Sequence, residues 1–516
     1  MSSCQLPDKE NNIFSDLSTI TKGAGITFAG IVIGKAFLFL YTIFLTRFIT
    51  ANDFGIYTLG ITLIMYLASL ADLGLGVTST RFIAIYQTHG DHGRVKGLVI
   101  TASAITLIVS LMVMVVVILF SDIAASAIFH KPQLGQLLKV LSISLPFECV
   151  MRTFLRTTQG LKLMSYSAIV EQTLWIVLRL LWSLIIFFWV GMNLEVAAWS
   201  YTASSAVCCL VAFYFLNKHI LLFDRTVVSI YEVRSQLKFS IPMVVSIFLG
   251  NISRQLDVLM LGLLSSANEL GIYASAMRLA ILAEFIYQVF NPIFNPMVSE
   301  LCEKMEIQKL GSLLKIITRW NFIISLPIFL CLAISPKLFL IVFGERFIGA
   351  SMVLTILAVA RIFSALSSLP NTMIYMSGRS DITVRNNVIT LLVNLCLNYY
   401  FIHVYGIIGA AMSTGISLLI LSAIRIIEVY NLMKVHPFSA SLFKPIIAAV
   451  FSLIGFAVFN FQFASGMSSS AISVILFLII YIVCIILFQI DDEEIQMMAL
   501  VKNKLSSFRE MCSIKN

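Results

Sequence analysis

The chain has 516 residues, of which 59% are apolar and only 12% charged, and its mean hydropathy is +0.96. Soluble globular proteins carry roughly 25% charged residues, so this composition excludes a soluble globular protein and indicates a protein embedded in a lipid bilayer. Lys and Arg outnumber Asp and Glu by 35 to 26, but the excess is scattered, which argues against a nucleic-acid partner. A span needs about 20 apolar residues, so the length allows about 12 to 15 helices and no large soluble catalytic domain.

Apolar runs of helical length follow one another along almost the whole chain. A first set of six lies at 23–46, 55–76, 97–119, 137–158, 166–190 and 195–216. Eight further runs lie at 237–264, 270–297, 316–340, 348–377, 382–402, 406–433, 443–463 and 470–490. We therefore predict an all-α integral membrane protein with about fourteen transmembrane helices, because a helix satisfies its own backbone hydrogen bonds in lipid.

The runs divide the chain into six predicted parts. These are a cytoplasmic tail at 1–22, a six-helix lobe at 23–216, a cytoplasmic connecting segment at 217–236, a second six-helix lobe at 237–433, two additional helices within 434–490 and a cytoplasmic tail at 491–516. The first 22 residues lack the apolar core and cleavage site of a signal peptide, so we expect the first span to remain as an anchor. The nine cysteines show no C-x-x-C spacing and no Cys/His cluster. We interpret them as packing residues, with neither disulfides nor a metal site.

Basic residues in the connections predict the orientation of the spans. About 17 Lys and Arg lie in even-numbered connections, whereas the odd-numbered ones hold about five. Since cytoplasmic loops collect positive charge, the even-numbered connections are predicted to be cytoplasmic. The five are Arg47, Lys131, Lys139, Lys337 and Arg346. This asymmetry predicts that both termini are cytoplasmic.

An internal repeat joins the two sets of six runs. Residues 51–57 read Ala-Asn-Asp-Phe-Gly-Ile-Tyr and residues 267–273 read Ala-Asn-Glu-Leu-Gly-Ile-Tyr, each between the first and second run of its set. Two weaker echoes follow, Gly160 with Gly378 and 196–198 with 409–411. The alternative for one match alone is that Gly-Ile-Tyr merely suits an interfacial turn. For all three, duplication is the better interpretation, and two lobes of the same topology predict an alternating-access transporter.

Several short motifs carry a family resemblance. They are Lys22-Gly23-Ala24-Gly25, Thr46-Arg47-Phe48 leading to 53–57, Asp72-Leu73-Gly74-Leu75-Gly76 before Thr80-Arg81-Phe82, and Arg254-Gln255-Leu256-Asp257 before Gly271-Ile272-Tyr273. Over roughly 20–490 the chain resembles the polysaccharide transporter (O-antigen flippase) family. Its superfamily also contains the lipid II flippases and the multidrug and toxin extruders.

The resemblance implies a function and its surroundings. It implies a flippase that moves undecaprenyl-diphosphate-linked oligosaccharide from the cytoplasmic to the outer leaflet of the inner (plasma) membrane, with no covalent chemistry and no cofactor. Membrane lipids, a polysaccharide polymerase and a chain-length regulator would be its partners. The glycan and the energy coupling stay open.

Ionisable residues inside the predicted spans are candidates for the substrate site, because each costs at least about 2.5 kcal/mol at the bilayer centre. The basic ones that we assign to a cationic cavity are Lys35, Arg179, Arg254, Arg278 and Arg361. Supporting polar groups on the seventh and eighth runs are Asn251, Asp257, Glu284, Gln288 and Asn291. For Arg254 with Asp257, and for Glu148 with Arg152, the alternative is a self-neutralised pair within one helix. Arg179 and Arg361 are equally compatible with interhelical pairing.

Three alternatives compete with a flippase. An organic-cation extruder of the same superfamily should have an acidic cavity, whereas the predicted cavity is basic. A membrane enzyme of lipid-linked glycan assembly would need a large outer loop with catalytic groups, and the outer turns here are short. A structural scaffold would not need uncompensated charges in its spans.

Overall fold

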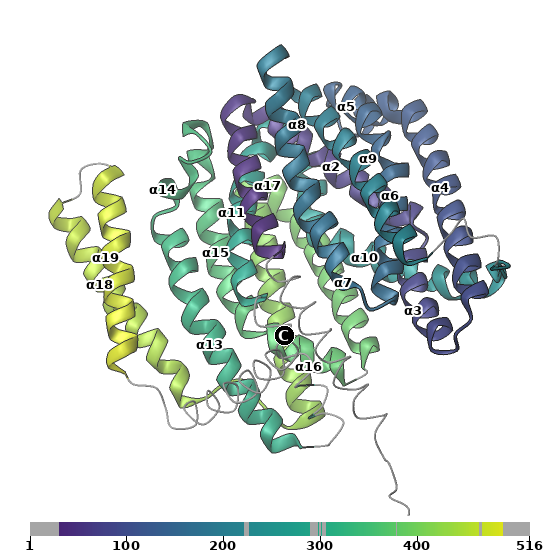
Figure 1. Ribbon diagram of the computed structural model, residues 1–516. Coiled ribbons are helices and arrows are strands. Elements are labelled where there is room, and N and C mark those ends of the chain that lie inside the picture. Colours follow the sequence, from purple (N-terminus) through teal and green to yellow (C-terminus); the bar gives the residue numbers. More distant parts are fainter. Residues whose placement is uncertain are drawn as a thin grey trace, which may run out of the picture.

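The computed structural model describes residues 30–220, 227–288, 298, 301, 306–377, 379–463 and 467–488. Within these ranges every regular element is a helix and no strand occurs (Figure 1). The predicted all-α fold is therefore confirmed. The predicted tails at 1–22 and 491–516 lie outside the described residues.

The helices from Gly30 to His219 are here called the N-half. The first, Gly30–Phe48, is followed by α2 (Ala51–Ala71), α3 (Leu75–Thr88), α4 (His92–Ile123) with the π-helical turn η1 (Ala124–Ile128), α5 (Gln133–Ser142), α6 (Ser144–Gly160), α7 (Met164–Ser167), the π-helical η2 (Ala168–Leu174), α8 (Trp175–Val190) and α9 (Leu194–His219).

The helices from Val233 to Met433 are here called the C-half. They are α10 (Val233–Leu264), α11 (Ala267–Gln288), α13 (Ile307–Ile334), α14 (Pro336–Leu340), the 3₁₀-helix η3 (Glu345–Ala350), α15 (Ser351–Leu366), α16 (Ser368–Met376) and α17 (Ser380–Met433). The chain ends with η4 (Ala440–Leu442), α18 (Phe443–Phe463) and α19 (Met467–Leu487).

The number of membrane spans follows from length and hydropathy. Eleven helices of the described ranges qualify, or twelve if α5 and α6, which meet at 41°, form one bent span. In this tally α17 counts once, although Gly406 divides it with φ 57° and ψ −132°. The predicted number of fourteen stays a prediction.

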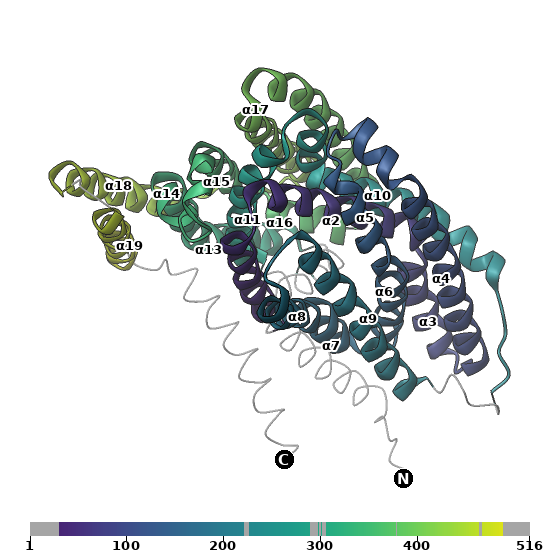
Figure 2. The same cartoon turned by 90° about the horizontal axis from the view of Figure 1, so that it is seen from above.

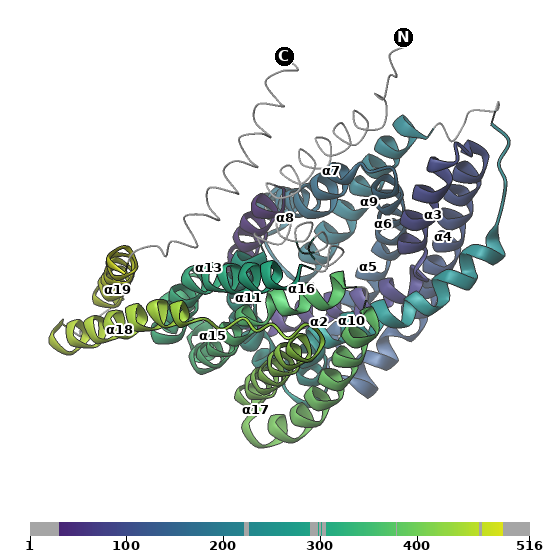
Figure 3. The same cartoon turned by 90° about the horizontal axis from the view of Figure 1, so that it is seen from below.

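The two halves lie side by side. Figures 2 and 3 show the N-half on one side of the molecule and most of the C-half on the other, with α10 reaching across to α3 and α4. α18 and α19 lie at the far edge beyond α13 and α14. α2 lies at the boundary, where it packs along α11 and also contacts α10. The final pair packs on α13, and α19 also reaches α14.

One helix boundary differs from the predicted run 55–76. α2 ends at Ala71, because Leu73 and Gly74 take left-handed backbone angles with φ 48° and 69°. Gly74 also approaches α10 so closely that a Cβ atom would lie 2.7 Å from the Ser240 carbonyl oxygen. The turn therefore starts a separate helix, α3, that hydropathy alone does not reveal.

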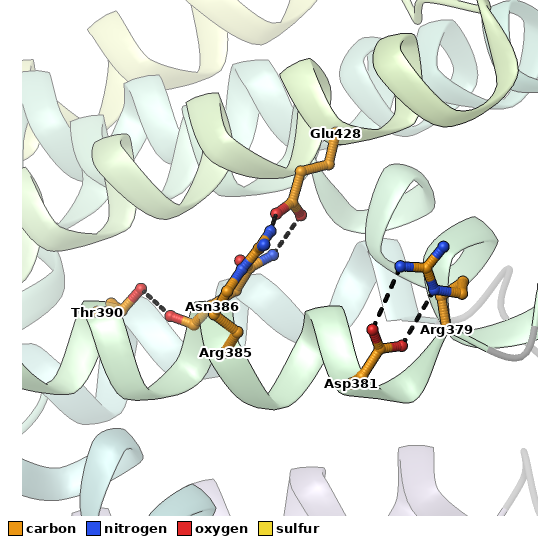
Figure 4. A network of polar contacts seen from close by, with 6 residues as sticks. All are labelled: Arg379, Asp381, Arg385, Asn386, Thr390 and Glu428. Atoms are coloured by element: carbon orange, nitrogen blue, oxygen red, sulfur yellow. Dashed lines mark hydrogen bonds and ion pairs between the residues drawn. The ribbon is translucent and has the colours of Figure 1, made fainter.

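A polar network ties together the two parts of α17, which fold back on each other at Gly406. Figure 4 shows Arg385 and Asn386 of the first part donating to the Glu428 carboxylate of the second. Nearby, Arg379 donates to Asp381 at 3.2 Å and 3.3 Å. The hairpin of α17 is thus closed by charge-assisted hydrogen bonds at the end away from Gly406.

The sequence repeat recurs as repeated contacts. The hydroxyl groups of Tyr41 and Tyr57 are 3.1 Å apart, and 216 residues later Tyr273 donates to Asp257. Helix caps repeat as well. The Asp53 amide donates to the Thr50 hydroxyl at 3.1 Å, and the Glu269 amide donates to the Ser266 hydroxyl at 3.2 Å. Equivalent contacts at one offset support duplication, although Gly378 of the second echo lies outside the described residues.

Candidate functional site

A cavity of about 400 Å³ lies where the N-half meets α10 and α11. Its walls come from the first helix, α2, α6, η2, α8 and α9, with Gln255 of α10 and Arg278 of α11 from the C-half. Among the residues that the structure describes, six lysine, arginine and glutamate side chains line it, namely Lys35, Glu148, Arg152, Glu171, Arg179 and Arg278. These four cations and two carboxylates give the described lining a positive surplus.

The two carboxylates lie on the N-half side. Glu148 is 1% exposed, pairs with Arg152 at 2.7 Å, and accepts a hydrogen bond from Tyr201 at 2.9 Å. This agrees with the alternative of a self-neutralised pair one helical turn apart. Glu171 lies in the π-helical segment and acts electrostatically on Arg152.

Arg179 is held by aromatic rings. Its guanidinium carbon lies 4.4 Å from the ring centroid of Tyr201, 5.2 Å from that of Trp175 and 5.8 Å from that of Tyr41. Stacking on aromatic faces stabilises a guanidinium without neutralising it, so the positive charge stays available to an anion.

Lys35 and Arg278 are the uncompensated cations of the cavity. Among the described residues neither forms a hydrogen bond or an ion pair, and the Nε atom of Arg278 is buried without a partner. Lys35 comes from the first helix and Arg278 from α11, and the two charges repel each other. A cation from each half therefore faces one cavity, and neither cation is paired with a carboxylate of the described residues.

Close helix packing places Lys35 there. A Cβ atom on Gly34 would lie only 2.0 Å from the backbone oxygen of Gln172, in the π-helical segment η2. The Thr173 hydroxyl donates to the Gly30 carbonyl at 2.9 Å. The first helix thus lies against η2, and the neighbouring residue Lys35 reaches the cavity. π-Helical insertions occur frequently at functional sites.

Arg254 lies outside the cavity, so its predicted place in the cationic lining is wrong. Its exposed side chain donates to the Gly250 carbonyl at 3.2 Å and to Asn251 at 3.3 Å, and neither Arg254 nor Asn251 lines the cavity. The reason is a break in α10 at Gln255, where φ is −137° and ψ is 26°. This break directs Gln255 into the cavity, where it accepts a hydrogen bond from Thr62 at 2.6 Å.

Asp257 and Arg361 form a second charged site inside the C-half. Asp257 is 5% exposed and accepts hydrogen bonds from Tyr273 and from the Val258 amide. The charge of Arg361 acts on both Asp257 and Tyr273. Neither Asp257 nor Arg361 lines the cavity, and within the described part of the chain Arg254 does not pair with Asp257. This arrangement favours interhelical pairing as the role of Arg361.

The remaining expected site residues are not described at the level of side chains. Glu284 and Gln288 belong to the backbone of α11, but their side chains lie outside the described set, and Asn291 lies outside the described residues altogether.

Aromatic side chains line the cavity, and the charge pattern of the spans does not predict them. Tyr41, Tyr57, Trp175 and Tyr201 all face it. The sequence carries a partial signal, because Tyr41 lies 16 residues before the tyrosine of the first Gly-Ile-Tyr motif, as Asp257 does before that of the second. Aromatic side chains are common throughout the spans, so no single one stands out from the sequence alone.

The amino-acid sequence is similar to a described protein family and to named transport proteins. A sequence model of the family described as polysaccharide biosynthesis protein matches residues 20–302. The chain is 29% identical over 190 residues to a probable low-salt glycan biosynthesis flippase of Haloferax volcanii. The matched segment covers 37% of this chain and 40% of that relative. It is 23% identical over 398 residues to a putative O-antigen transporter of Shigella flexneri. Here the matched segment covers 76% of this chain and 92% of that relative.

Solved structures show the same fold. A lipid II flippase in an inward closed conformation matches with a TM-score of 0.72 and 14% identity, covering 91% of this chain and 98% of that one. An inward-facing multidrug resistance transporter of the MOP superfamily matches with a TM-score of 0.62 and 16% identity, covering 81% of this chain and 94% of that one. These relatives are named as transporters and flippases, in agreement with the expectation that the chain is a transport protein and no enzyme. The chain is a multi-pass membrane protein that belongs to the polysaccharide biosynthesis protein family.

Proposed function

We propose that this protein is a flippase that moves undecaprenyl-diphosphate-linked oligosaccharide across the membrane. The observation that carries the proposal is the pair Lys35 and Arg278, two cations of the cavity that have no partner among the described residues. A diphosphate supplies the missing negative charge and bridges the two halves. Aromatic rings and the amide of Gln255 in the same cavity offer stacking faces and hydrogen bonds to sugars.

The transport step needs no reaction of the lipid. The headgroup enters from the cytoplasmic side and leaves to the outer leaflet when the halves rock, while the polyprenyl tail stays in lipid. An inside-negative potential assists outward movement of negative charge by roughly 2.3 kcal/mol per charge and 100 mV. The predicted orientation, with both termini cytoplasmic in the inner membrane, fits this direction. The polymerase and the chain-length regulator that use the exported repeat unit are the proposed partners.

The proposed division into lobes follows the sequence prediction. Residues 23–216 and 237–433 act as the two moving bodies, 217–236 connects them, and the helices within 434–490 extend the second body. The repeated caps and tyrosine contacts support this division, because equivalent contacts occur in both halves.

An organic-cation extruder is the competing function, because the multidrug resistance transporter described above shares this fold. Its substrate would enter a cavity whose described charged lining has four cations and two carboxylates, one of which is already paired with Arg152. Like charges in a site of low dielectric repel, so the lining disfavours a cationic substrate.

Reconstitution into liposomes tests the function directly. The probe is polyprenyl diphosphate carrying one fluorescent N-acetylglucosamine, with dithionite added outside to bleach the accessible leaflet. A flippase makes nearly all of the probe accessible, whereas protein-free liposomes protect about half. In parallel, uptake of ethidium is measured. Ethidium movement together with a protected half of the diphosphate lipid would identify an extruder and overturn the proposal.

A further inference from the structure

The two copies of the sequence repeat meet at one point of contact. A Cβ atom on Gly55 of α2 would lie 1.9 Å from the Ala267 carbonyl oxygen of α11, and one on Gly271 would lie 1.8 Å from the Ala51 carbonyl oxygen. The contacts are reciprocal and involve backbone atoms, which cannot move aside as a flexible side chain can. Alanine and glycine four residues apart on each helix allow this backbone approach.

A buried lysine of the N-half lies beside this crossing. Lys131, in the turn between η1 and α5, is 8% exposed, and its ammonium donates to the carbonyl oxygens of Gly262 at 2.6 Å and Ser265 at 2.9 Å. These carbonyls belong to the C-terminal turn of α10, where the helix leaves its acceptors unsatisfied and its dipole attracts a cation. Burial lowers the pKa of Lys131, so the carbonyl acceptors offset a real desolvation cost.

An arginine of the C-half makes the equivalent contact in the other direction. Arg346, in η3 between α14 and α15, donates to the carbonyl oxygen of Ile49 at 3.0 Å and to that of Arg47 at 3.4 Å. These oxygens belong to the C-terminal end of the first helix. Ile49 lies 216 residues before Ser265, so the two acceptors are equivalent positions of the repeat.

Two more contacts join the halves at the same end. The Arg47 side chain donates to the carbonyl oxygens of Val342 at 2.8 Å and Ile341 at 2.9 Å. The rings of Phe54 in α2 and Phe347 in η3 meet edge to face with centroids 5.9 Å apart. The halves are therefore connected by polar contacts around the glycine crossing and by apolar packing next to it.

We propose that this end of the molecule is a reciprocal latch, in which Lys131 and Arg346 each cap a helix end of the opposite half around the Gly55–Gly271 crossing. The latch holds the state seen here, and opening toward this end requires both caps to break. It extends the proposed function by naming the residues that set the balance between the two states. Under the predicted orientation this end faces outward, so the latch controls release.

Distances between spin labels test the latch without any substrate. Labels at Trp189 of the N-half and Asn268 of the C-half, both exposed, are attached in a chain whose native cysteines are replaced. Wild type should give one dominant distance. The double variant Lys131→Gln, Arg346→Gln should add a longer distance, with the ratio of open to latched molecules rising roughly ten-fold for each cap removed, which corresponds to about 1.4 kcal/mol.

Lys139→Gln is the matched control, because Lys139 lies close to Lys131 in the chain but pairs with Asp122 of its own half at 2.6 Å. It should leave the distances unchanged. A double variant whose distances match those of wild type would overturn the latch. Since the labels report conformation alone, this result can be told apart from a failure of flipping in liposomes.

The glycine crossing provides a second, independent variant. Gly271→Ala should push α11 away from α2 and favour the longer distance, whereas Gly349→Ala should not, because a Cβ atom there meets nothing within 4 Å. If Gly271→Ala folds with the wild-type distance, the crossing is no part of the latch. Size-exclusion chromatography of each variant confirms that a shift in distance comes from folded protein.

Discussion

Neutralising an unpaired cation of the cavity should raise the stability of the empty protein and lower the rate of transport. Lys35 and Arg278 repel each other across the cavity and have no partner among the described residues. A charge at membrane depth costs at least about 2.5 kcal/mol, and the open cavity reduces this cost by admitting water. We therefore expect Lys35→Met to stabilise the empty protein by about 1 kcal/mol, since the methylene chain keeps its packing.

The same substitution should abolish most transport, because the diphosphate loses one of its two bridging cations. Thermal unfolding in detergent measures the first effect, and a gain of about 1 kcal/mol raises the midpoint by roughly 1–2 °C in a chain of this size. Flipping in liposomes measures the second. A lower midpoint for Lys35→Met would show that the ammonium has a stabilising partner and would refute the reasoning.

The remaining predictions concern neighbouring contacts. Glu148→Ala should destabilise the protein by about 1–3 kcal/mol, because the half-buried Arg152 loses its ion-pair partner and the buried Tyr201 hydroxyl loses its acceptor; thermal unfolding in detergent checks this. Gly34→Ala should lower both the unfolding midpoint and the flipping rate, since the Cβ atom meets the Gln172 carbonyl, whereas Gly250→Ala, where a Cβ atom meets nothing within 4 Å, should be neutral in the same assays. Arg254→Gln should keep most of the flipping rate, because the side chain is exposed outside the cavity; a loss as large as that of Lys35→Met would place Arg254 back in the transport path.

Some features of the site follow from the sequence because their physical cause is local. Lys35 and Arg278 stand out since a charge in an apolar run is costly wherever the helix packs. The pair of Glu148 with Arg152 follows from its spacing of four residues. The repeat at 51–57 and 267–273 is visible because duplication preserves spacing along the chain.

Other features depend on backbone geometry that hydropathy does not encode. The break at Gln255 rotates the following residues of α10, so Arg254 and Asp257 end in different surroundings although their spacing predicts one helix face. α3 begins only because Leu73 and Gly74 turn the chain. The approach of Gly55 to Gly271 joins residues 216 positions apart, and nothing in either copy of the motif alone indicates that the copies touch.

Titration of undecaprenyl diphosphate against the purified protein tests the central claim that the cavity binds an anionic lipid headgroup. We predict that the double variant Lys35→Gln, Arg278→Gln binds at least about a hundred-fold more weakly than wild type, because charge-assisted contacts to phosphate contribute roughly 1.5–3 kcal/mol each. A variant of Lys139, whose partner is Asp122 of the same half, should bind as wild type does. Equal affinity of the double variant and wild type would contradict the account.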